Sequence, residues 1–325
     1  MANMLFIGPK FYNYHEVIKN GFEKVGFCVD YFDDRPDSSF MTKVLVRINR
    51  RLIRGKIKKY FNSILNKTNG KKYDVVFVLY GQSFDKNLMK VLKEQHPESR
   101  FIFYMYDPIS SLPDRKEFVD VFDDCYSFDS DDCKKYGFKL VPLFYSFKNF
   151  EKKDIVYDAC FISTMMPGKY SKSKEIIRQL SEHGYNVFTH MFIQSKLVYK
   201  YFKIKSKDFK KSKIKEFTFK RLSNTEMNNI ISQSRYIIDC QKEGQSGLTI
   251  RTFEALSAEK KLITTNSNIK EYDFYRPENI YVFDGHIDFD DIFFKKSFVP
   301  LSFEVKANYS IDSWVKKILA NYKEN

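Results

Sequence analysis

The chain has 325 residues, 43% of them hydrophobic and 17% aromatic, and it carries a formal net charge of +14. The aromatic content argues against an intrinsically disordered chain, and the length suits two domains of roughly 150 residues each. No apolar run reaches the roughly 18 residues of a membrane-spanning helix. The opening "MANMLFIGPKFYNYHEV" lacks the charged and apolar regions of a signal peptide. We therefore expect a cytoplasmic protein with two buried cores.

Apolar runs alternate with helical patterns along the chain. In the first half, strands are predicted at 4–8, 28–32, 73–81, 100–107, 125–129 and 139–145, and helices at 14–26 and 85–95. After the polar stretch 146–156, strands are predicted at 157–163, 185–193, 236–240, 261–266 and 279–284, and helices at 170–184, 224–234 and 310–323. Continuous apolar strands separated by helices indicate parallel sheets covered on both faces.

This pattern predicts an α/β fold with two Rossmann-like domains facing each other across a cleft. The expected boundaries are 1–148 for the first domain and 154–308 for the second, followed by a crossover helix at 309–325 that packs back on the first domain. Open parallel sheets bind ligands at the carboxyl ends of their strands, so two such edges suit a reaction between two substrates.

The positive charge is concentrated in two stretches. Between Ser38 and Tyr73 there are eleven Lys and Arg residues and no acid, and between Lys196 and Arg221 there are eleven more with two acids. Residues 41–67 also place apolar side chains on helical faces, which predicts two short basic helices that either rest on an anionic membrane or are buried on one side. Because no recognised nucleic-acid motif accompanies the charge, we expect 41–67 and 196–221 to face an anionic membrane surface rather than a nucleic acid.

The segment "GQSGLTIRTFEALSAEKKLITTN" (244–266) is predicted to form a helix and then a strand. Arg251 and Glu254 are three residues apart and share one helical face. Ser246 and Gly247 are predicted to lie at the helix start, where free N–H groups and the helix dipole favour a phosphate. Arg251 would then neutralise a diphosphate, and Glu254 would accept the hydroxyls of a ribose. The alternative is a surface ion pair worth a few tenths of a kcal/mol, and the spacing does not decide between them.

An ordered set of stretches resembles bacterial GT-B glycosyltransferases of lipopolysaccharide and capsular polysaccharide biosynthesis. The residues that carry the resemblance are Asp239, Gln245, "GLT" (247–249), Arg251, "EAL" (254–256) and "KKLITTN" (260–266), with "YFDDRP" (31–36), "MYD" (105–107), "YSFDSDDCKKYGFKLVPLFY" (126–145), "YDACFIST" (157–164) and "FYRPENIYVFD" (274–284). The resemblance implies a metal-independent, hexosyltransferase-like enzyme without a cofactor. It would move a sugar from a UDP- or GDP-linked donor to a glycan or lipid-linked acceptor, at the inner face of the cell membrane. A nucleotide-sugar epimerase and a non-catalytic membrane or nucleic-acid-binding protein are the alternatives.

The resemblance also implies a set of donor-binding residues. They are Ser163, Thr164, Lys169, Lys174, Gln245, Ser246, Gly247, Leu248, Thr249, Arg251 and Glu254. Lys169 and Lys174 would balance the charge of the diphosphate leaving group, although a solvated, lysine-rich helix start is the simpler interpretation. Ser163 stands where the family often has glycine, and Ser246 stands where many relatives carry an acid.

Two residues are candidate catalytic bases for the acceptor hydroxyl. Asp107 ends the predicted strand at 100–107, where its alternative role is to cap the turn before Pro108. His15 follows the first strand, where its alternative role is a helix-entry residue. Asp129 and Asp131 have the DxD spacing of a metal–diphosphate site, but they also precede a predicted helix, and we interpret them as capping residues. No metal site is expected, because the sequence has no clustered His and Cys residues.

Overall fold

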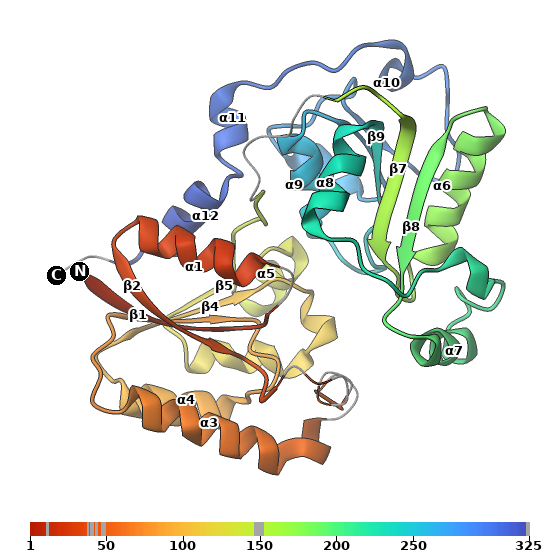
Figure 1. Cartoon of the computed structure of the whole chain (residues 1–325). Coiled ribbons are helices and arrows are strands. Elements are labelled where there is room, and N and C mark those ends of the chain that lie inside the picture. The colour runs from red at the N-terminus through yellow and green to blue at the C-terminus, as the bar shows by residue number, and fades with distance from the viewer. Residues whose placement is uncertain are drawn as a thin grey trace. The chain divides into compact units, whose positions relative to one another are not determined.

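The structure is a computed structural model that describes residues 1–10, 13–37, 39, 42, 45, 46, 50–145 and 153–322 (Figure 1). The chain divides into two compact units, Met1–Pro142 with Ile311–Asn325, and Leu143–Ser310. We call them the N-terminal and the C-terminal unit. None of the helices within the described ranges has the length and apolar character needed to cross a lipid bilayer.

The N-terminal unit is built on a six-stranded, all-parallel sheet with the order β2-β1-β3-β4-β5-β6. The strands are β1 (Ala2–Gly8), β2 (Phe27–Asp33), β3 (Val75–Leu79), β4 (Arg100–Met105), β5 (Asp124–Ser127) and β6 (Lys139–Leu140). Because β2 and β3 lie on opposite sides of β1, the strand order reverses there, and the carboxyl ends of β1 and β3 flank a topological switch point. The predicted strand 139–145 is only two residues long.

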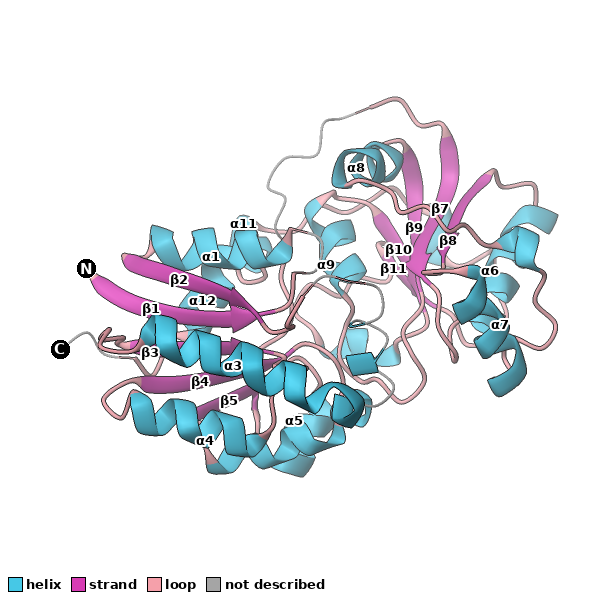
Figure 2. Ribbon diagram, turned by 60° about the horizontal axis from the view of Figure 1, so that its bottom comes forward, coloured by secondary structure: helices cyan, strands magenta, loops and turns pink. Residues whose placement is uncertain are grey.

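Helices cover both faces of this sheet (Figure 2). They are α1 (Tyr14–Lys24), α3 (Arg54–Thr68), α4 (Lys86–Gln95), α5 (Ser130–Tyr136) and α12 (Ile311–Ile318), with 3-10 segments η1 (Arg50–Ile53), η2 (Ile109–Ser111) and η3 (Pro113–Asp120). In α3, Ile57, Phe61 and Ile64 are buried in the core together with β-strand residues. The apolar face of this helix therefore packs on the sheet and is not available to a membrane. The first of the two helices predicted within 41–67 falls largely outside the described residues.

The C-terminal helix α12 packs on α1, as the sequence predicted. Its Trp314 is 2% exposed and lies 4.9 Å from the ring of Tyr104 and 6.4 Å from that of Phe22. Gly21 lies inside α1, and a Cβ atom there would stand 3.0 Å from Cγ2 of Val315. Glycine weakens a helix interior by roughly 1 kcal/mol relative to alanine, so the close approach of α12 explains why this position has no side chain.

The C-terminal unit contains a five-stranded parallel sheet with the order β11-β10-β9-β7-β8. The strands are β7 (Tyr157–Thr164), β8 (Val187–Phe192), β9 (Ser234–Asp239), β10 (Lys261–Thr264) and β11 (Ile280–Val282). The helices are α6 (Tyr170–Glu182), α7 (Lys196–Lys205), α8 (Asn224–Ser232), α9 (Ile250–Ser257), α10 (Ile292–Lys295) and α11 (Phe303–Ala307).

Both faces of this second sheet are buried. Ile238 of β9 belongs to one apolar cluster and its neighbour Ile237 to another, as expected for side chains that alternate across a strand. The first cluster includes Leu180 of α6 and the second includes Phe253 of α9. This two-sided burial explains why the strands read as continuous apolar runs in the sequence.

Candidate functional site

The start of helix α9 is held by the carboxyl end of β9. Asp239, the last residue of that strand, is 6% exposed and accepts hydrogen bonds from the hydroxyls of Thr249 at 2.7 Å and Thr252 at 3.0 Å. Thr249 is the N-cap, because its hydroxyl also accepts from the backbone N–H of Arg251 at 3.1 Å. The helix therefore begins at Ile250, whereas the sequence predicted its start at Ser246 and Gly247.

The residues before Thr249 form a fixed, buried loop. The carbonyl oxygens of Ser246 and Gly247 accept from the side-chain amide of Asn266 at 3.1 and 3.2 Å. The side-chain amide of Gln245 donates to Gly247 O at 2.8 Å, and Leu248 is 1% exposed. The prediction that Ser246 and Gly247 form a helix N-terminus is thus wrong, because a threonine three residues downstream supplies the capping oxygen. Asn266 was not among the site residues predicted from the sequence, although its place at the end of the strand "KLITTN" was a usable signal.

Arg251 and Glu254 form a buried ion pair. Nη1 of Arg251 lies 2.5 Å from Oε2 of Glu254, and their side chains are 14% and 2% exposed. Nη2 of Arg251 donates to the carbonyl oxygen of Ile162 at 3.3 Å, next to Ser163 and Thr164 at the end of β7. The surface ion pair that the sequence left open is therefore excluded by the burial. Arg251 links α9 to the carboxyl end of β7, the edge where open parallel sheets bind ligands.

The two lysines predicted to balance a diphosphate differ in their surroundings. Lys174 Nζ lies 2.8 Å from Oε1 of Glu216, whose other oxygen accepts from the Tyr170 hydroxyl at 2.6 Å. Burial alone would raise the pKa of Glu216, but the hydrogen bonds from Lys174 and Tyr170 lower it overall. The charge of Lys174 is therefore already paired. Lys169 directly precedes α6. Burial raises the pKa of Cys240, the residue after β9, to about 12, and the positive charge of Lys169 opposes this rise. Lys169 therefore lies near the end of β9.

A carboxylate of the basic stretch 196–221 occupies the N-terminus of α6. The side chain of Asp208 accepts from the backbone N–H groups of Gly168 at 2.9 Å, Tyr170 at 3.0 Å and Ser171 at 2.8 Å. A hollow of about 720 Å³ adjoins it. Its lining includes four lysines, Lys172, Lys205, Lys207 and Lys242. Asp208 thus supplies from within the chain the negative charge that a helix N-terminus favours.

Both candidate bases belong to the N-terminal unit. Asp107 lies two residues beyond the end of β4 and is partly buried. His15 lies in the first turn of α1, with its ring 5.2 Å from that of Tyr31. Burial lowers the pKa of His15, which favours the neutral form of its imidazole. A neutral imidazole can accept a proton, as a general base must.

The DxD stretch is a helix cap. Asp129 is 2% exposed and accepts from the backbone N–H groups of Asp131 at 3.2 Å and Asp132 at 3.1 Å at the start of α5. This geometry confirms Asp129 as the capping residue, while Asp131 lies in the first turn of α5 and donates its backbone N–H to that cap. Among the described residues, no group of three or more His, Cys, Asp or Glu side chains is arranged to hold a metal ion.

Comparison with known proteins identifies the fold. No protein-family model matches the sequence, and no curated protein matches it either. Among solved structures, the chain is similar to the lipopolysaccharide outer core galactosyltransferase WaaB, with 11% identity, a TM-score of 0.54, and 98% of each chain covered. A glycosyltransferase from Rickettsia africae matches with 11% identity and a TM-score of 0.52 over 99% of this chain and 98% of that one. Anabaena HepE, solved in complex with UDP and glucose, matches with 9% identity and a TM-score of 0.52 over 99% of this chain and 95% of that one. The chain therefore has the GT-B fold, with two Rossmann-like α/β domains.

Proposed function

We propose that the protein is a glycosyltransferase whose C-terminal unit binds a nucleotide-sugar donor. The observation that carries this proposal is the buried Arg251–Glu254 pair, which joins α9 to the carboxyl end of β7. A buried charge pair is costly unless its hydrogen bonds are satisfied, and this pair lies at the carboxyl edge where open parallel sheets bind ligands. The similarity of the fold to WaaB and HepE supports the same assignment, and the UDP in the HepE structure makes UDP the first nucleotide to test.

In this proposal, each donor-side residue has a stated task. Arg251 pairs with the diphosphate and Glu254 accepts the ribose hydroxyls, so their mutual hydrogen bond is exchanged in part for bonds to the ligand. Lys169 adds positive charge next to the leaving group, which stabilises the charge that develops on it in the transition state. Lys174 contributes less, because Glu216 already neutralises it. Ser163, Thr164 and the loop Gln245–Thr249 shape the wall of the site.

Calorimetric titration with UDP and GDP tests the donor site. Arg251→Gln and Glu254→Gln should each weaken nucleotide binding by about tenfold or more, since a hydrogen bond to a charged group contributes roughly 1.5–3 kcal/mol. Arg178→Gln is the matched control, because Arg178 forms another i,i+3 pair, with Glu175, on the exposed face of α6. Unchanged nucleotide affinity in both test variants would remove this helix from the donor site.

The acceptor side of the proposal concerns the N-terminal unit. We propose that Asp107 or His15 removes the proton from the attacking hydroxyl of a glycan or lipid-linked acceptor of bacterial surface polysaccharide. Asp107→Asn or His15→Gln should abolish sugar transfer while nucleotide affinity is retained. A variant with full turnover is excluded as the base. Product formed from the nucleotide sugar without any acceptor would support an epimerase instead, and loss of transfer in EDTA would contradict metal independence.

We further propose that the C-terminal unit binds to the anionic inner face of the cell membrane. On α7, Leu197, Tyr201 and Ile204 are 70%, 54% and 77% exposed, and their i, i+4, i+7 spacing places them on one face. Exposed lysines at 196, 200, 205 and 207 flank this face. Each lysine near an anionic surface adds roughly 1 kcal/mol of attraction, and the apolar side chains add to it by entering the interface.

Vesicle co-sedimentation tests this surface. Binding should require anionic lipid and weaken with salt, and Leu197→Ser with Ile204→Ser should reduce it. Phe303→Ser is the matched control, because Phe303 on α11 is 79% exposed and lies outside α7. Binding that is equal for neutral and anionic vesicles, or unchanged in the double variant, would refute the assignment.

A further inference from the structure

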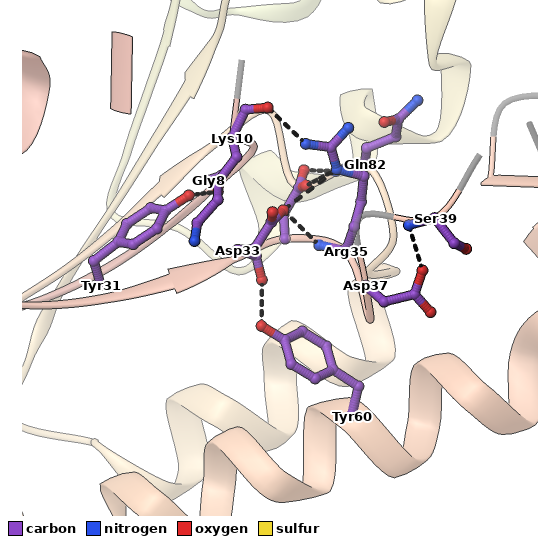
Figure 3. Close-up of polar contacts among 10 residues, drawn as sticks. Gly8, Lys10, Tyr31, Asp33, Arg35, Asp37, Ser39, Tyr60 and Gln82 are labelled. Carbon is purple, nitrogen blue, oxygen red and sulfur yellow. Dashed lines mark hydrogen bonds and ion pairs between the residues drawn. The ribbon is translucent and has the colours of Figure 1, made fainter. Parts of the chain in front are cut away.

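The carboxyl edge of the N-terminal sheet holds a second polar cluster, which the donor site does not use. At the switch point, the loop after β2 brings Asp34 to the loop after β3, where its Oδ2 accepts from the backbone N–H of Gln82 at 2.8 Å. Asp33, Arg35 and Gln82 gather here in Figure 3. Tyr80 has a φ of +67°, and Gly81 N donates to Leu79 O at 2.7 Å, so the chain makes a strained three-residue turn. Strained loops of this kind concentrate at ligand-binding sites.

Two arginines converge beside this edge. Nη2 of Arg115 lies 3.4 Å from Oδ2 of Asp114, and the same oxygen pairs with Nη2 of Arg50. The Arg115 side chain is fully buried, with its guanidinium 4.4 Å from the ring centre of Phe118. The Arg50 side chain remains 26% exposed, so the pair reaches the surface through Arg50.

This pair has more hydrogen-bond donors than acceptors. Nε and Nη1 of Arg115 and Nη1 of Arg50 are buried and have no hydrogen-bond partner among the residues that the structure describes. The same holds for the hydroxyl of Ser83 and for Oδ1 of Asp34 within the described ranges. Buried polar groups are nearly always hydrogen-bonded, and a buried cation without sufficient acceptors is especially costly. Three charged donors therefore lack a common acceptor.

Burial and a neighbouring cation both disfavour the charge of Arg115. Burial, together with the nearby Arg50, lowers its pKa to about 9, while Asp34, Tyr80 and Asp85 oppose the shift. Burial raises the pKa of Asp34 to about 7, although Gln82 and Arg35 oppose this, so it is only partly charged near neutral pH. Asp114 contacts both guanidinium groups, Asp85 also attracts both electrostatically, and Glu117 attracts Arg50. None of these carboxylates accepts a hydrogen bond from the three buried donors of the arginines among the residues that the structure describes.

We propose that Arg50 and Arg115 form a binding site for an oxyanion, a phosphate or a carboxylate, at the switch point of the N-terminal unit. A water molecule offers two lone pairs and no net charge, whereas an oxyanion offers several oxygens to the fork of guanidinium donors. The buried hydroxyl of Ser83, next to Gln82 in the loop after β3, has no hydrogen-bond partner among the described residues. If the proposed glycosyl transfer holds, this oxyanion is carried by the acceptor, which would then be an acidic sugar or a phosphate-bearing glycan or lipid.

Hydrogen–deuterium exchange of the full-length protein tests this site without any nucleotide. Inorganic phosphate and D-glucuronate are the two probes, one for each oxyanion class. At least one of them should slow exchange in peptides over 80–84 and 113–120. In Arg50→Gln, the same protection should need about tenfold more of the probe, since each lost charged hydrogen bond weakens binding by that order. Arg178→Gln on the other unit should leave it unchanged.

Arg50→Gln is preferred over Arg115→Gln, because Arg115 is fully buried and its loss threatens folding. The fluorescence of Trp314, the single tryptophan, verifies that the N-terminal unit is folded in each variant. Absence of protection by both probes, or equal protection in Arg50→Gln, overturns the site. Neither result would change what the nucleotide titrations of the Arg251 and Glu254 variants show about the donor site. Lost nucleotide binding with retained phosphate protection would refute only the donor assignment.

Discussion

Replacing Asp34 by asparagine should stabilise the N-terminal unit at neutral and alkaline pH. Asp34 is fully buried, and burial raises its pKa from the ordinary 3.8 to about 7, against the opposing effects of Gln82 and Arg35. Asparagine keeps an oxygen that accepts the Gln82 N–H and never ionises. The substitution therefore preserves the observed hydrogen bond and removes the buried charge.

The sign and size of this effect follow from proton linkage. Between pH 3.8 and about 7, the unfolded chain loses the Asp34 proton while the folded protein keeps it, so the stability of the wild-type protein falls as pH rises. A shift of about 3 units corresponds to about 4 kcal/mol, at roughly 1.4 kcal/mol per unit. The advantage of Asp34→Asn should thus be near zero at pH 4, grow through pH 7 and level off above it.

Urea unfolding followed by Trp314 fluorescence measures this difference, because Trp314 lies in the core of the N-terminal unit. Asp30→Asn, on the preceding strand β2, is the control of opposite sign. Hydrogen bonds from Lys71 and Tyr73 lower the pKa of Asp30, so that variant should lose stability at neutral pH and recover it as pH falls. A difference between Asp34→Asn and wild type that stays constant from pH 4 to pH 8 would refute the reasoning.

Three further substitutions test contacts elsewhere. Gly21→Val should destabilise the N-terminal unit by about 1–3 kcal/mol through overpacking against Val315, and adding Val315→Ala should restore part of the loss in the same urea assay. Asp208→Ala leaves three N–H groups of α6 without their carboxylate, so exchange at 168–171 should accelerate and the melting temperature should fall, by an amount matching about 1–2 kcal/mol. Thr249→Val removes the N-cap of α9 and one of the two hydroxyls that donate to Asp239. Scanning calorimetry should show that the free energy of unfolding falls by about 1–3 kcal/mol. An unchanged melting profile in either of these last two variants would contradict the corresponding contact.

Much of the fold could be predicted from local patterns. Strands with a continuous apolar run, such as 75–79 and 101–105, are buried on both faces, and the alternation with helices indicated parallel sheets. The helix that carries Arg251 and Glu254 was predicted because i,i+3 spacing and flanking apolar residues are properties of the sequence alone. The capping role of Asp129 was also predicted, since a cap bonds to residues only two or three positions away.

The sequence by itself therefore determined most of the alternation of strands and helices, without α7, α10 and α11, and the placement of Arg251 and Glu254 on one helical face. Only the tertiary structure decided that this pair is buried, and it brought Arg251 to the carbonyl oxygen of Ile162, 89 residues away in the sequence. The contact of Thr249 with Asp239 also placed the N-cap of α9 at Thr249 and its first residue at Ile250. The apolar face of α3 is buried in the core. The arginine pair at positions 50 and 115 has no signature in the sequence, since the two residues meet only when distant loops gather at one edge of the sheet. Local spacing encodes periodicity, whereas the environment of a charge is set by neighbours that folding brings from elsewhere in the chain.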